Sequence, residues 1–233
     1  MNELQGAFLR RERANEHLPE LERLVREIVQ LCENGVLADV NMETEEVRPA
    51  PWVVDPLRSR ASVLVGEVVY NLRAALDYLV FVLAENDSGK RQSGTQFPIE
   101  DSQQGFTSHR LTRLKGVSDE HAAIIRQFQP YRGCEWTRIL RDLSNPDKHR
   151  ELVSVDVDFT LNRLVTMHDV PVWGVSTEEG AHVDAADDEM TVYLKGPALV
   201  TLPDGLPVIE TLQQLNQQAT LLLLLFSYEF PSS

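Results

Sequence analysis

Two segments of the sequence place ionisable side chains among apolar neighbours, a pattern typical of a buried polar cluster or a binding site. The first, GEVVYNLRAALDYL at 66–79, carries Glu67, Asn71, Arg73, Asp77 and Tyr78. The second, LSNPDKHREL at 143–152, carries Asn145, Asp147, Lys148, His149 and Arg150. Because an unpaired charge is costly to bury, we expect carboxylates of the first segment to pair with bases of the second. Arg73 is expected to pair with Asp77 or Asp147.

This set of side chains supports two interpretations, and the sequence leaves both open. One is a structural network that fixes a central helix against the turn at 147–150. The other is a cleft that binds a ligand or a phosphodiester. In the second case His149 would act as general acid or base, while Arg73, Lys148 or Arg150 would stabilise the charge that develops on phosphorus. We therefore take Arg73, Lys148 and His149 as the candidate catalytic residues.

A long helix at about 55–85 must position the first segment, with Asp55 as its expected N-cap and Pro56 at its first position. Apolar residues occur on both faces of this helix, which indicates burial on both faces. Its polar residues fall on two narrow flanks. Glu67, Asn71 and Tyr78 share one flank, and Arg73 and Asp77 share the other.

The rest of the chain predicts a single α+β domain over 1–233. Its helical core would comprise 1–150 and 206–230, and an antiparallel β-meander at about 151–202 would form a sheet insert at 151–203 before the C-terminal helix. The insert is predicted from apolar and polar residues that alternate with period 2. Residues 102–117 carry few apolar side chains, and we expect a surface loop there. Asn145 and Pro146 are expected to begin a separate helical turn.

The composition narrows the classes of function. The net charge of −14 opposes nonspecific binding to nucleic acid or to an anionic membrane. We expect no DNA partner, no membrane association, no metal and no cofactor. Cys32 and Cys134 do not form a metal-ligand or redox motif, which suits the cytoplasm. The leucine-rich last helix, Leu221 to Phe226 above all, favours a homodimer or a protein partner.

Four motifs occur in the order GEVVYNLRAALDYL, FPIED at 97–101, QPY at 129–131 and LSNPDKHREL. This arrangement resembles a widespread family of uncharacterised bacterial proteins, over about residues 55–155. The first motif also resembles the Arg-x4-6-His element of HEPN helical domains, many of which are metal-independent ribonucleases that act as dimers. Arg73 takes the arginine position, but Tyr78 stands where that resemblance would place the histidine.

We therefore expect a non-enzymatic module that binds a ligand or a partner and contains a buried polar cluster. The alternative is a HEPN-like, metal-independent ribonuclease of the toxin or phage-defence type, and only this alternative implies RNA as a partner. The two hypotheses differ in whether Arg73 closes on Asp77 or opens, with Tyr78 and Lys148, into a positively charged cleft.

Overall fold

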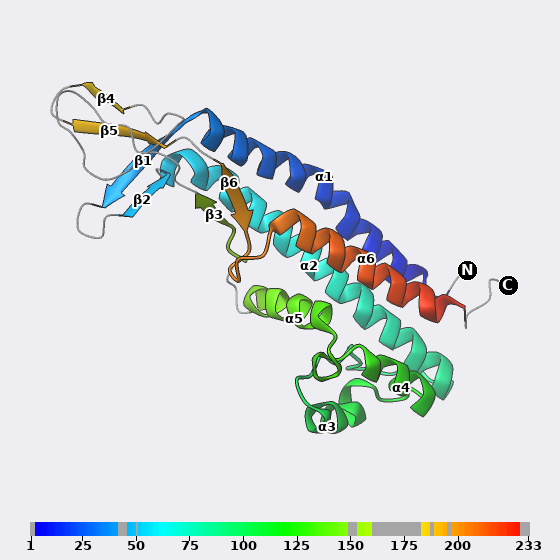
Figure 1. The fold of residues 1–233 in the computed structure, drawn as a ribbon. Coiled ribbons are helices and arrows are strands. Elements are labelled where there is room, and N and C mark those ends of the chain that lie inside the picture. The colour runs from blue at the N-terminus through cyan, green and yellow to red at the C-terminus, as the bar shows by residue number, and fades with distance from the viewer. Residues whose placement is uncertain are drawn as a thin grey trace. The chain divides into compact units, whose positions relative to one another are not determined.

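The protein is largely helical. A computed structural model of the chain describes residues 3–41, 46–49, 51–148, 153–159, 183–186, 189–194 and 197–228. These residues form six α-helices: α1 (Gln5–Asn34), α2 (Pro51–Ser88), α3 (Gln103–Arg113), α4 (Asp119–Gln127), α5 (Glu135–Lys148) and α6 (Val208–Ser227). A 3-10 turn, η1 (Pro130–Arg132), precedes α5. Figure 1 traces these elements from the N-terminus to the C-terminus.

The contacts between residues divide the chain into two compact units. The first comprises Met1–Pro19, Leu64–Val153 and Glu210–Ser233, and the second comprises Glu20–Val63 and Ser154–Ile209. Helices α1 and α2 are continuous and contribute one part to each unit. The single-domain assignment stays a prediction.

In the first unit, the N-terminal part of α1 lies antiparallel to both α2 and α6 (Figure 1). Arg10 bonds to Asn71 on α2, Arg11 bonds to Thr220 on α6, and Asn15 accepts a bond from Asn216 one turn earlier on α6. The core between these helices is apolar. Its fully buried members include Leu4, Leu72, Leu76, Leu79, Leu83, Leu212, Leu223 and Phe226.

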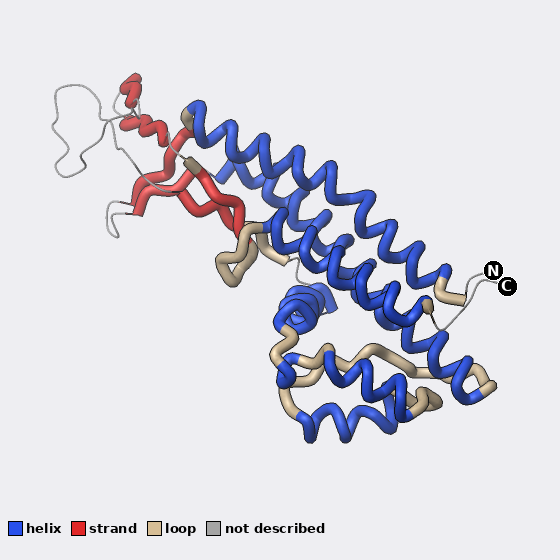
Figure 2. Tube along the Cα trace, turned by 45° about the vertical axis from the view of Figure 1, so that its right-hand side comes forward, coloured by secondary structure: helices blue, strands red, loops and turns tan. Residues whose placement is uncertain are grey.

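The second unit contains the described strands, which Figure 2 draws in red, and each of their pairings is antiparallel. β1 (Val36–Asn41), β2 (Glu46–Pro49), β4 (Val183–Ala186) and β5 (Glu189–Leu194) form a sheet in the order β2-β1-β5-β4. β3 (Asp156–Phe159) and β6 (Ala198–Thr201) form a separate two-stranded sheet. The meander predicted at 151–202 therefore accounts for only some of these strands, because β1 and β2 come from the segment before α2.

The start predicted for the central helix is wrong. α2 begins at Pro51, so that Asp55 and Pro56 lie inside it and Asp55 pairs with Arg58 at 3.1 Å. Proline suits the first position of a helix, because the N–H at this position has no partner within the helix and proline has no N–H. Pro51 therefore fits the start of α2. Arg58 also donates to the Val155 carbonyl at 2.8 Å, and this contact joins the first part of α2 to the chain that leads into β3.

Two further sequence predictions are corrected. The expected loop at 102–117 contains α3, which Ser102 caps by accepting the N–H of Gly105 and which buries Phe106. One large buried side chain suffices for a short surface helix, so the low apolar content misled the prediction. The separate turn expected at Asn145 is a continuation of α5, because the buried face formed by Trp136, Leu140 and Leu143 extends the helix past that local signal.

Ser118 caps helix α4. The Ser118 hydroxyl accepts the N–H of His121 at 3.2 Å. We expect Ser118→Ala to lower the free energy of unfolding by about 1 kcal/mol, because one N–H of the first turn loses its partner. Urea denaturation followed by circular dichroism measures this change. Ser108→Ala on the exposed surface of α3 is the control, and an equal loss in both variants would contradict the capping role.

Candidate polar cleft

The first flank of α2 faces α1. Glu67 lies 3.2 Å from His17 Nδ1, and Asn71 accepts a hydrogen bond from Arg10 at 3.4 Å. The Arg10 guanidinium also lies over the ring of Tyr78, 5.6 Å from its centroid. Glu67, Asn71 and Tyr78 therefore belong to a polar seam between two helices, and this partner of Glu67 on α1 was not predicted from the sequence.

The second flank of α2 holds a backbone segment. Arg73 and Asp77 form an ion pair at 3.3 Å, which confirms one of the predicted pairings. The Nη2 of Arg73 donates to the carbonyl oxygen of Phe97, and Asp77 Oδ1 accepts the Phe97 N–H at 2.8 Å. Both backbone groups of Phe97 are thus bound by side chains one helical turn apart. We call this arrangement the Phe97 clamp.

Gln129 holds the other end of the same segment. Its side chain is fully buried and accepts the N–H of Glu100 at 3.0 Å. It also donates to the carbonyl oxygens of Pro98 at 2.9 Å and of Ile125 at 3.1 Å. Buried backbone groups outside helices and strands need such partners. The motifs around Arg73, Phe97 and Gln129 therefore meet in one structural element.

The clamped segment forms one wall of a polar cleft of about 470 Å³. Three arginines line this cleft, namely Arg73 from α2, Arg113 from α3 and Arg141 from α5. Three carboxylates also line it, namely Glu100, Asp101 and Asp142. The formal charges of these six side chains cancel, so the cleft is highly polar without being strongly positive or negative.

All three carboxylates that line the cleft are bound to arginines. Glu100 accepts bonds from Arg113 at 2.9 Å and from His109 at 2.8 Å. Arg141 bonds to Asp101 at 2.7 Å and to Asp142 at 2.9 Å. Arg141 is therefore bound to two carboxylates. Glu100 and Asp101 both belong to the FPIED motif of the clamped segment.

Arg73 is the most constrained charge in the cleft, since only 9% of its surface is exposed. Burial lowers the pKa of its guanidinium, and Asp77 opposes this shift. The nearby charge of Arg113 lowers the pKa further, and Glu100 raises it. Two guanidinium groups thus line the same cleft, and Asp77 and Glu100 offset the effect of Arg113 on the charge of Arg73.

The predicted site residues separate into three groups. Arg73 and Asp77 meet at the cleft, whereas Glu67, Asn71 and Tyr78 lie along α1. Asn145, Asp147 and Lys148 lie in α5, but their side chains are not among those described, and His149 and Arg150 lie outside the described residues. The pairing of α2 with the 147–150 segment therefore stays a prediction.

Residue-level reasoning did not identify Glu100, Arg113, Gln129 and Arg141 as site residues. Glu100 and Gln129 belong to FPIED and QPY, so those motifs were a usable signal. Arg113 and Arg141 lie in helices with many exposed charges, and nothing in their spacing distinguishes them from their neighbours.

The described residues offer little support for thiol or metal chemistry. Burial raises the pKa of Cys32 to about 11 and also raises the pKa of Cys134, so neither thiol forms the reactive thiolate readily near pH 7. Among the described side chains, no three His, Cys, Asp or Glu residues gather as metal ligands would. None of the helices searched in the described part of the chain is both long and apolar enough to span a bilayer.

Comparisons of the chain with protein-family models, with curated proteins and with solved structures found no match. The resemblance to the uncharacterised bacterial family and to HEPN domains therefore stays a prediction.

The Phe97 clamp gives a prediction about stability. Asp77→Ala should lower the free energy of unfolding by about 2–4 kcal/mol, because Arg73 loses its counterion and the Phe97 N–H loses its acceptor. Asp77→Asn should cost less, since the amide oxygen can still accept that N–H. Urea denaturation measures both changes.

Asp142→Ala is the matched control, because Asp142 pairs with arginines on the exposed part of α5 and is itself about half exposed. Its loss should cost less than about 1 kcal/mol. Equal destabilisation by Asp77→Ala and Asp142→Ala would contradict the clamp.

Proposed function

We propose that this protein is a non-enzymatic binding module and that the polar cleft binds a small anionic ligand carrying carboxylate or phosphate groups. The observation that carries this proposal is that Arg73 and Arg113 both line the cleft, where the charge of Arg113 adds to the burial that disfavours the charge of Arg73. An anion between them would relieve this repulsion in a partly desolvated place, where charge-assisted hydrogen bonds are strong.

The donors that such a ligand needs are present on both arginines. A guanidinium group has five N–H donors. In the described structure, Arg73 makes a hydrogen bond through Nη2 and Arg113 makes one through Nη1. Ser144 and Gln96 also line the cleft and can supply neutral hydrogen bonds. The proposed place of action is the cytoplasm, where Cys32 and Cys134 would stay reduced.

Binding is favoured over the ribonuclease alternative by the positions of Arg73 and Tyr78. Arg73 is closed on Asp77 and Phe97, and Tyr78 lies on the other flank of α2 beside Arg10. In the HEPN-like alternative Tyr78 takes the histidine position and would have to act together with Arg73, but the two side chains lie on different flanks of α2. Lys148 and His149 keep their predicted place in that alternative.

Isothermal titration with inorganic phosphate and with citrate tests the proposal. We expect saturable binding of at least one of these anions, and Arg113→Gln should weaken it about tenfold or more, because a charge-assisted contact is lost. Arg138→Gln is the matched control. Arg138 lies on α5 one turn before Arg141, pairs with Glu135 at 2.7 Å and does not line the cleft.

We expect Arg138→Gln to bind the anion with the affinity of the wild type. Circular dichroism checks that both variants are folded. No binding of either anion to the wild type would contradict the proposal. RNA cleavage in EDTA that is lost in a folded Arg73→Gln variant would replace it with the ribonuclease function.

A further inference from the structure

Helix α6 is apolar on its exposed face as well as on its buried face. Leu221, Leu224 and Leu225 are 42–52% exposed, and Tyr228, which follows the helix directly, is 86% exposed. Their spacing of three, one and three residues places all four on one stripe of the helix surface. Other side chains of the helix are buried in the core of the first unit, including Leu222, Leu223 and Phe226.

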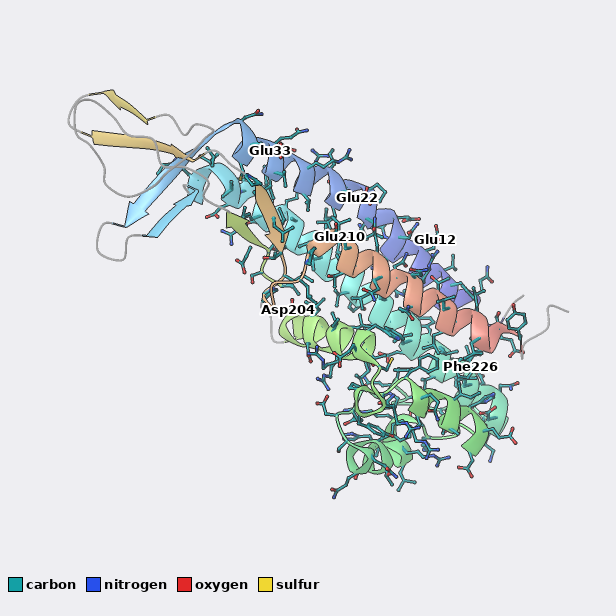
Figure 3. The ribbon with its side chains drawn as sticks, viewed as in Figure 1. Glu12, Glu22, Glu33, Asp204, Glu210 and Phe226 are labelled. Carbon is teal, nitrogen blue, oxygen red and sulfur yellow. The ribbon has the colours of Figure 1, made fainter. Side chains whose placement is uncertain are left out.

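The same stripe continues towards the start of α6 with neutral polar residues. Gln213, Gln214 and Gln217 are exposed there. Glu210, in the first turn of α6, is the last charged residue before the stripe. Figure 3 labels Glu210 and also Phe226, which lies near the end of the helix. Residues 211–228 contain no charged side chain at all. We call the exposed stripe from Gln213 to Tyr228 the α6 face.

The α6 face differs in charge from the chain as a whole. The sequence has 22 basic and 36 acidic residues, and its net charge of −14 makes two copies repel each other. Contact between copies is therefore least opposed where no charge is present. The α6 face meets this condition over its whole length, while its leucines give the contact an apolar centre.

The face is also suited to contact with an identical face. In a two-fold interface the same patch meets itself. Leucine side chains pack against leucine, and the glutamine amides both donate and accept hydrogen bonds, so each can pair with its counterpart. A strongly acidic or basic partner would find no charge complementarity along the α6 face.

We infer that the α6 face binds a second copy of this chain and forms a two-fold homodimer centred on Leu221 and Leu225. The cleft is lined by α2, α3, α5 and the segment before α3, and no residue of the α6 face lines it. Self-association and anion binding can therefore succeed or fail separately.

Sedimentation equilibrium over a wide range of protein concentration tests the inference. We expect the wild type to reach twice the chain mass, and the double variant Leu221→Glu, Leu225→Glu to remain at the chain mass, because carboxylates would face carboxylates across the axis. Leu111→Glu is the matched control, since Leu111 is 77% exposed on α3. It should dimerise like the wild type.

The milder variant Leu224→Gln should weaken the dimer. Its circular dichroism and its urea midpoint should stay at wild-type values when both proteins are measured at a concentration where they are monomeric, which separates loss of contact from loss of folding. A wild type that stays at the chain mass at the highest concentration would overturn the inference. So would a dimer that persists in the folded double glutamate variant.

Discussion

The charge of Arg73 is buried inside a helical core, and the way in which the protein compensates that charge determines the geometry around it. Asp77 supplies the counterion from the next turn of α2. Arg73 donates a hydrogen bond to the carbonyl oxygen of Phe97, and Asp77 accepts one from the Phe97 N–H. Phe97 is fully buried, so the clamp holds an irregular segment against α2 without leaving its polar groups unpaired. Glu100 follows on that segment and reaches the cleft.

Much of the helical fold could be predicted because its signals are local. The apolar pattern of α2 and the leucine-rich sequence of α6 required only neighbouring residues. The start of α2 was missed because Asp55 and Pro56 form a good local signal that the longer helix overrides. The strand order could not be predicted, because the pairing of β1 with β5 joins segments far apart in the sequence.

The candidate site was predictable to the same extent and for the same reason. The pairing of Arg73 with Asp77 follows from a spacing of four residues along one helix. The partners that give the pair its structural role, Phe97 and Gln129, lie in other parts of the chain, and their contacts depend on tertiary packing. Arg113 reaches the cleft only because α3 forms, and the sequence predicted a loop there. The anion-binding proposal therefore rests on contacts that only the fold provides.

Native-state amide hydrogen exchange tests the central claim most directly, because it reports whether each backbone N–H is held. The account predicts that the amides of Phe97 and Glu100 exchange nearly as slowly as the core amides of α2, although both lie outside helices and strands. The exposed turn at Gly94 gives the reference for unprotected amides in the same loop. Exchange of Phe97 and Glu100 at the rate of Gly94 would contradict the clamp. Slow exchange that is lost at Phe97 in Asp77→Ala would establish it.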